Sequence, residues 1–195
     1  MPFSVSASSL GLLRECPRCF WLQLVEKKRR PSGAFPSLPS GIDGLLKKHF
    51  DDYAARGRLP PELDSIDAKP FHDHALLEKW RNWRAGLRLK DEASGVSLCG
   101  AVDNVLEKEG KLIVLDFKTR GYALKEDTAR HYQGQLDVYE YLLQENGFET
   151  QPYAYLLFYV PEKINARGEF VFQTHLVKMA VDAGRAKALF RKAIA

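Results

Sequence analysis

The stretch Gly100–Gly121, GAVDNVLEKEGKLIVLDFKTRG, decides how this chain folds. It lies across two runs rich in Val, Leu and Ile, Val96–Lys108 and Lys111–Lys118, which are separated by Glu109-Gly110. An acidic residue followed by glycine between two apolar runs is a turn signal. The stretch therefore predicts a β-hairpin.

The turn also predicts the register of this hairpin. If Glu109-Gly110 form a two-residue loop, Lys108 pairs with Lys111. Counting outward from that pair places Asp103 directly opposite Asp116, and a four-residue loop gives the same pairing. Directly opposed side chains have Cβ atoms about 4.5–5.5 Å apart, so two carboxylates there repel each other unless a cation neutralises them. The hairpin therefore predicts a site for a divalent cation.

The alternation of side chains predicts a sheet that is covered on both faces. Lys118 lies on the same face as Asp116, because successive side chains of a strand point to opposite faces. That face also carries Leu112 and Val114, and the other face carries Ile113, Leu115 and Phe117. Buried carboxylates and an ammonium have to pair or bind a metal ion. A cross-strand Asp–Lys salt bridge at the sheet end, with the second carboxylate in solvent, is the alternative to a metal site.

The other periodic segments predict helices and strands around the hairpin. Helical patterns occupy Ser8–Leu13, Pro17–Leu24, Gly41–Arg56, His74–Leu89, Lys125–Asn146 and Val181–Ala195. Strand patterns occupy Tyr153–Val160 and Glu169–Val177, joined by a loop over Pro161–Gly168. We expect one domain over residues 1–195, with a helical part to about 90, the hairpin, helix and strands over about 95–178, and a last helix over about 180–195. This order predicts an α/β protein with a mixed sheet flanked by helices on both faces.

Three segments together resemble a known family. They are GAVD at residues 100–103, VLDFKT at residues 114–119 and QLDVY at residues 135–139. A Gly-x-x-Asp strand, an Asp-x-Lys strand and a Gln-x-x-x-Tyr helix, in this order, are similar to the RecB-type branch of the PD-(D/E)xK nuclease superfamily. The string SASSLGLLRECPRCFWL at residues 6–22 also looks like the start of that branch, where a serine-led helix precedes a Cys-Pro-Arg element.

The resemblance implies a restriction-endonuclease-like core and a metal-dependent DNA nuclease. It implies hydrolysis of phosphodiester bonds as an exonuclease in DNA repair, recombination or CRISPR adaptation. By this resemblance Asp103 and Asp116 hold Mg²⁺ or Mn²⁺, and the backbone carbonyl of Phe117 is a further ligand. Lys118 is implied to orient the attacking water or to stabilise the transition state.

Two helical segments carry the other residues of the implied site. Gln135 and Tyr139 lie on the apolar stripe of Lys125–Asn146, where a glutamine needs a polar partner that the hairpin carboxylates can supply. The resemblance implies that these two residues support the site or bind the DNA strand. His49 lies in the apolar stripe of Gly41–Arg56, where a histidine packed in the core is the alternative. The branch places a metal-ligating histidine on a helix at this point, so we expect His49 as a ligand that raises the preference for Mn²⁺.

The charge balance is compatible with nucleic-acid binding but does not require it. The chain has 29 Lys and Arg against 25 Asp and Glu, which gives a net charge of +4 and a pI near 8.9. A helix over His74–Leu89 carries Arg81, Arg84 and Arg88 on one face. This row is a candidate contact for a DNA backbone, and a solvated face is the alternative.

The three cysteines argue against a disulfide framework and against an iron–sulfur cluster. Cys16 and Cys19 form a C-x-x-C, but such clusters usually take four protein ligands, and the CRISPR-adaptation relatives place three of theirs near the C-terminus. This chain has none after Cys99, although further cysteines past Ala195 would change that expectation. No apolar run approaches the roughly 18 residues of a membrane span, and the N-terminus lacks signal-peptide features, so we expect a cytoplasmic protein.

Two other functions are compatible with the sequence. The domain could keep the nuclease fold and bind nucleic acid without turnover, inside a larger helicase–nuclease or CRISPR assembly with protein partners. Alternatively, the hairpin is purely structural and the chain is an interaction domain. The sequence leaves open whether the substrate is single- or double-stranded, the polarity of cleavage, and whether the enzyme acts at ends or internally.

Overall fold

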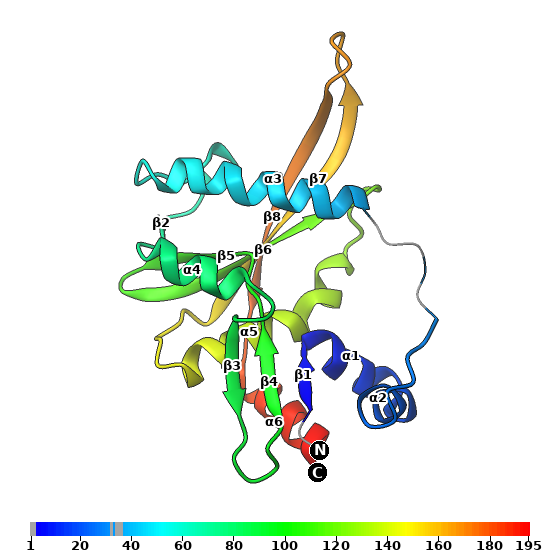
Figure 1. Cartoon of the computed structure of the whole chain (residues 1–195). Helices are drawn as coiled ribbons and strands as arrows, with labels where there is room; N and C mark the ends of the chain where they lie inside the picture. The colour runs from blue at the N-terminus through cyan, green and yellow to red at the C-terminus, as the bar shows by residue number, and fades with distance from the viewer. Residues whose placement is uncertain (1–2, 32, 34–36) are drawn as a thin grey trace.

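The computed structural model describes residues 3–31, 33 and 37–195, which form two sheets with helices around them (Figure 1). The helices are α1 (Ala7–Glu15), α2 (Pro17–Leu24), α3 (Ser37–Ala54), α4 (His74–Arg81), α5 (Gln133–Glu145) and α6 (Ala183–Ile194), with short 3₁₀ helices η1 (Pro61–Leu63) and η2 (Thr128–Tyr132). The strands are β1 (Ser4–Ser6), β2 (Lys69–Pro70), β3 (Leu87–Lys90), β4 (Ser97–Gly100), β5 (Asn104–Lys108), β6 (Lys111–Thr119), β7 (Tyr153–Ile164) and β8 (Phe170–Ala180).

The predicted hairpin lies in the centre of a mixed sheet. Among the described residues, this sheet has the strand order β2-β5-β6-β7-β8, with β6 and β7 parallel and the other neighbours antiparallel. Lys108 pairs with Lys111 and Asn104 with Leu115, so the predicted register is confirmed. Glu109 and Gly110 have φ angles of 53° and 75°, the left-handed conformation that a two-residue hairpin loop requires.

The single strand predicted over Val96–Lys108 is wrong. It divides into β4 and β5, which belong to different sheets, and residues 101–103 between them belong to neither. Within the described residues, β4 is the middle strand of a second sheet with the order β1-β4-β3. Helix α5 packs on β4 so closely that a Cβ at Gly100 would lie 2.7 Å from Leu142 Cδ1. Asp103 therefore lies where the two sheets part, immediately before the hairpin pairing begins.

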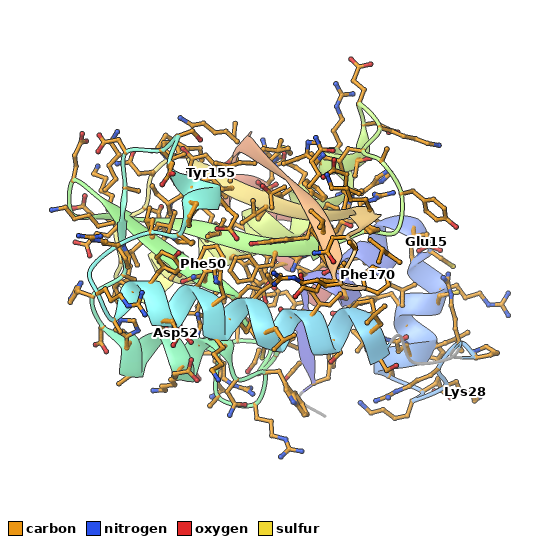
Figure 2. All side chains as sticks on the ribbon, turned by 90° about the horizontal axis from the view of Figure 1, so that it is seen from above. Glu15, Lys28, Phe50, Asp52, Tyr155 and Phe170 are labelled. Carbon is orange, nitrogen blue, oxygen red and sulfur yellow. The ribbon has the colours of Figure 1, made fainter. Side chains whose placement is uncertain are left out.

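Helices cover both faces of the central sheet, as predicted. Leu112 and Val114 belong to a core with residues of α1, α4, α5 and α6, whereas Ile113, Leu115 and Phe117 belong to a second core with residues of α3. Figure 2 shows Phe50 on the sheet side of α3 and Asp52 on the opposite side. The α/β class with a mixed sheet between helices is confirmed.

The helix predicted over His74–Leu89 ends early, at Arg81. Asn82 adopts an extended backbone, and residues 87–90 form β3, which pairs with β4. The apolar spacing of Trp80, Trp83 and Leu87 had the period of a helix, but Trp83 is 73% exposed. The strand is favoured here because Leu87 and Leu89 alternate with charged residues and face the core. Arg81, Arg84 and Arg88 therefore do not form a row on one helix.

The C-terminal strands are longer than predicted. β7 continues to Ile164, through the first half of the region assigned to a loop over Pro161–Gly168, and β8 continues to Ala180. The two strands project from the body as a two-stranded ribbon (Figure 1). The last helix and the helix of the Gln-x-x-x-Tyr motif are present as α6 and α5, the latter preceded by η2. Pro17 is the first residue of α2, as its fixed φ angle favours.

Candidate active site

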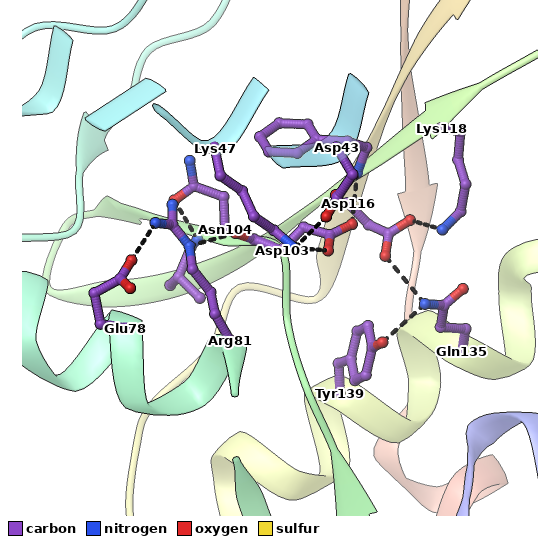
Figure 3. A network of polar contacts seen from close by, with 12 residues as sticks. Asp43, Lys47, Glu78, Arg81, Asp103, Asn104, Asp116, Lys118, Gln135 and Tyr139 are labelled. Atoms are coloured by element: carbon purple, nitrogen blue, oxygen red, sulfur yellow. Dashed lines mark hydrogen bonds and ion pairs between the residues drawn. The ribbon is translucent and has the colours of Figure 1, made fainter. Parts of the chain in front are cut away.

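Asp103 and Asp116 lie together at the end of the β5–β6 hairpin (Figure 3). Asp103 Oδ2 accepts a hydrogen bond from the backbone N–H of Phe117, over 3.1 Å. This bond holds the Asp103 carboxylate beside the residue that follows Asp116. The two side chains point into one space between α3, the hairpin and α5, so the juxtaposition expected from the register is present.

Asp116 is buried, and its ionisation is coupled to its neighbours. Its side chain is 1% exposed, and Oδ2 is ion-paired with Lys118. Burial raises the pKa of Asp116 to about 7, the Lys118 ammonium opposes that rise, and the carboxylate of Asp103 adds to it. The ammonium of Lys118 also lies 4.7 Å from the centre of the Tyr132 ring. The site therefore holds more buried negative charge than Lys118 offsets.

Helix α5 adds Gln135 and Tyr139, one turn apart, to the buried side of this site. Gln135 Nε2 donates to Asp116 Oδ1 over 3.1 Å and to the Tyr139 hydroxyl over 2.8 Å. Burial, and then the charge of Asp116, raise the pKa of Tyr139, which keeps its hydroxyl protonated. The absent side chain at Gly100 allows α5 to approach this closely. The sequence predicts a hairpin carboxylate as the polar partner of Gln135, and Gln135 contacts one of them, Asp116.

Helix α3 supplies two residues that sequence reasoning missed. Lys47 Nζ lies 3.1 Å from Asp103 Oδ1 and 2.8 Å from Asp43 Oδ2. Burial alone would lower the pKa of Lys47, but the carboxylates of Asp103 and Asp43 outweigh it and raise that pKa. One sequence signal could have pointed to these residues. Asp43 and Lys47 are four residues apart, at the edge of the apolar stripe of α3 to which Leu46 and Phe50 belong.

The oxygen donors of this site fit a hard divalent cation. Carboxylates and backbone carbonyls are ligands that Mg²⁺ accepts. The N–H and C=O of one strand residue point to the same neighbouring strand, so the carbonyl of Phe117 is directed to the side of Asp103, as its N–H is. A cation there would relieve the repulsion that contributes to the raised pKa of Asp116. In the described part of the chain, no three His, Cys, Asp or Glu side chains form a preassembled metal cluster.

A family model of the PD-(D/E)XK nuclease superfamily matches residues 4–194. The chain belongs to this superfamily. Its members are nucleases that generally use divalent metals such as Mg²⁺, so membership implies phosphodiester hydrolysis and a nucleic-acid substrate. A solved structure described as "Crystal structure of SSO0001" is similar with a TM-score of 0.48 and 14% identity, over 98% of this chain and 75% of that one. No curated protein matches the chain.

The arginines expected to track DNA have other positions in this PD-(D/E)XK protein. The Arg81 side chain is 7% exposed and forms ion pairs with Asp51 and Glu78. Its Nε donates to the backbone carbonyl of Asp103 over 2.8 Å, so Arg81 positions that residue and is not free to contact a phosphate. Arg84 and Arg88 are exposed; Arg84 stacks on Trp83 and Arg88 donates to Cys99 Sγ.

His49 is not brought to the carboxylates of this PD-(D/E)XK site. Its Nε2 lies 3.1 Å from Glu62 Oε1, which also accepts a hydrogen bond from the Tyr159 hydroxyl. Lys47 and His49 are two residues apart on α3, about 200° around the helix axis. Because Lys47 faces Asp103, His49 faces away from it and links α3 to η1.

Cys16, Cys19 and Cys99 are free, and Cys16 Sγ caps α2 by accepting the N–H of Cys19. The Cys19 side chain, and then this backbone hydrogen bond, lower the pKa of the Cys16 thiol. The absence of an iron–sulfur cluster stays a prediction. Within the residues described, no helix has both the length and the hydropathy needed to span a membrane.

Proposed function

We propose that this chain is a metal-dependent deoxyribonuclease that acts as an exonuclease, and that Asp103, Asp116 and Lys118 carry out the reaction. One observation carries the proposal: Asp103, from the segment before β5, lies beside Asp116 and Lys118 of β6 in one mostly buried site, where Asp116 is ion-paired with Lys118. A salt bridge with one solvated aspartate would not need Asp103 to be held by the backbone of Phe117. Cytoplasmic DNA repair, recombination or CRISPR adaptation is the proposed setting.

In this proposal Asp103, Asp116 and the carbonyl of Phe117 would hold Mg²⁺ or Mn²⁺. The bound ion would acidify water and neutralise charge on the scissile phosphate. Lys118 then donates to the attacking water or to a phosphate oxygen, and its fixed position beside Asp116 preorganises that contact. Gln135 and Tyr139 are positioning residues, because Gln135 fixes one Asp116 oxygen and Tyr139 fixes Gln135.

The test is incubation of end-labelled single- and double-stranded DNA with Mg²⁺ or Mn²⁺, with EDTA as the blank. We expect cleavage by the wild type and a loss of at least about a thousandfold in Lys118→Ala and Asp116→Ala. Lys111→Ala is the matched control, because Lys111 lies on the same strand, away from the carboxylates, and forms a surface ion pair with Glu149. Circular dichroism would verify that the variants fold.

The competing function is a nucleic-acid-binding module without turnover, within a larger assembly. It predicts that DNA binds while no product appears with either ion. Equal cleavage by the wild type and by both site variants would show instead that the activity belongs to a contaminant or to another site. Parallel assays on RNA of the same sequence would test the preference for DNA.

A further inference from the structure

A basic groove runs beside the active site, between α1, the segment from Arg130 to Gly134, and α6. It consists of three adjoining hollows of about 790, 220 and 890 Å³. Arg14 lines all three, and His131 lines two of them. These shared residues place the three hollows next to one another, and together they are called the basic groove.

The charge of this groove is positive. Its lining includes Arg14, Arg130 and Lys192, which are exposed and to which the described residues give no ion-pair partner. The two acidic residues of the lining are already paired. Asp137 is buried and accepts two hydrogen bonds from the Arg185 side chain, and Glu15 is ion-paired with Arg30. The groove therefore offers unneutralised cations to an anionic ligand.

The groove leads to the candidate active site. Gln135 lines its middle hollow and donates to Asp116 Oδ1. Arg14 lies next to this point, because a Cβ at Gly134 would be 3.4 Å from Arg14 Nη1. A ligand in the groove would thus meet Gln135, the side chain that donates to Asp116.

The shape and the lining of the groove fit one nucleic-acid strand. Helices α1 and α6 contact each other and both pack on α5, so the groove between them is narrow, with a helix spacing of roughly 10 Å. Among the residues described, the lining has no Trp, Tyr or Phe to stack on bases. Ser8 and Gly11 form a floor of small side chains, and nothing lies within 4 Å of a Cβ built at Gly11. Phosphates, not bases, match this surface.

We propose that the basic groove binds the phosphate backbone of a single nucleic-acid strand, without regard to base sequence, and leads it to Asp103 and Asp116. The proposal rests on the proposed nuclease function. It specifies single-stranded substrate, or a single-stranded end, as the form that the site receives.

The test is fluorescence anisotropy with a labelled single-stranded oligonucleotide of mixed sequence, in EDTA, so that binding is measured without hydrolysis. We expect Arg14→Glu and Lys192→Glu each to weaken binding about tenfold and to lower the slope of log K against log salt by roughly 0.7 for each phosphate that the variant no longer neutralises. Lys187→Glu is the matched control, because Lys187 is on α6 but lines a different hollow, with Arg191 and Asp91; its affinity should stay within twofold. Gly11→Gln, which fills the open floor without adding charge, should also weaken binding.

Two outcomes would refute the proposal that the basic groove binds a single strand. Equal weakening by Lys187→Glu and by the groove variants would show only a general effect of net charge. Equal affinity for a blunt duplex would contradict a groove that admits one strand. The test of the groove can be separated from the test of catalysis. A wild type that binds through Arg14 but never cleaves would refute the nuclease function and support the groove. Cleavage by the wild type, with unchanged binding by Arg14→Glu and Lys192→Glu, would support the nuclease function and refute the groove.

Discussion

Lys47 Nζ lies 3.1 Å from Asp103 Oδ1, so an ammonium of α3 binds the carboxylate that we propose as a metal ligand. The same ammonium lies 2.8 Å from Asp43 Oδ2, which places it between two carboxylates. A divalent ion and the Lys47 ammonium would compete for the negative charge of the Asp103 carboxylate. In the proposed nuclease, the affinity of the site for metal would therefore depend on Lys47, which is not itself a ligand.

The first prediction is that Lys47→Met tightens binding of the divalent ion. Loss of the competing ammonium should lower the Kd for Mg²⁺ or Mn²⁺ by about threefold to tenfold in calorimetric titration. The metal-free protein should lose roughly 1 kcal/mol of stability, because the partly exposed ion pair is removed. Lys48→Met, one residue along on the exposed side of α3, should change neither quantity. Weaker binding by Lys47→Met would mean that Lys47 assists the metal.

The second prediction concerns pH. In the metal-free protein the pKa of Asp116 is raised to about 7, and a divalent ion binds the ionised carboxylate. At pH 6 most Asp116 is protonated, so metal binding should release close to one proton, and the affinity should rise roughly tenfold between pH 6 and pH 8. Calorimetry in buffers of different ionisation enthalpy measures that release. A pH-independent Kd over this range would refute the assignment.

The same raised pKa fixes the sign of the effect on stability. Between about pH 4 and pH 7 the folded protein keeps a proton on Asp116 that the unfolded chain, with a carboxyl pKa of 3.8, releases. Stability without metal should therefore fall as pH rises through this window. Asp116→Asn should flatten the dependence of Tm on pH. A slope equal to that of the wild type would place the titration on another group.

The third prediction tests the close approach of α5 to β4. Gly100→Ala would bring a Cβ to 2.7 Å from Leu142 Cδ1 and 3.1 Å from two ring carbons of Tyr139. The buried side chains of Leu142 and Tyr139, or the helix that carries them, must shift. This should cost about 1–3 kcal/mol in the free energy of unfolding and disturb the contact of Gln135 with Asp116. Gly11→Ala, at a helical position with open space, should be neutral or stabilising by about 0.5–1 kcal/mol. Equal denaturation midpoints for the two variants would contradict this.

The hairpin and its carboxylate pair were predictable because their signals are local. Glu109-Gly110 set the turn, the turn set the register up to the pair Asn104–Leu115, and Asp103 and Asp116 are the residues next to that pair. The break of the strand at residues 101–103 was not predictable, because it depends on β4 joining a different sheet and on α5 packing against Gly100. Sequence periodicity carries no information about such long-range pairing.

The sequence also could not predict which side of α3 faces the site. An apolar stripe with His49 in it predicts a helix, but the rotation of that helix on the sheet is set by tertiary packing of Leu46 and Phe50. That packing turns Lys47 toward Asp103. The end of α4 was missed for a related reason: Trp80, Trp83 and Leu87 repeat with a helical period, and only the pairing of β3 with β4 decides between helix and strand.

The last prediction separates a structural histidine from a metal ligand. His49 is paired with Glu62, and Tyr159 donates to the same carboxylate, so His49→Gln should reduce stability by about 1 kcal/mol through this contact between α3 and η1. Its Kd for Mn²⁺ should stay within twofold of the wild type, because the side chain faces away from Asp103. Asp103→Asn is the comparison, since it removes a proposed ligand charge and should weaken binding at least tenfold. If His49→Gln weakened Mn²⁺ binding as strongly as Asp103→Asn, α3 would have to rotate on the sheet when the metal binds, and the pairing of Lys47 with Asp103 would describe only the metal-free state.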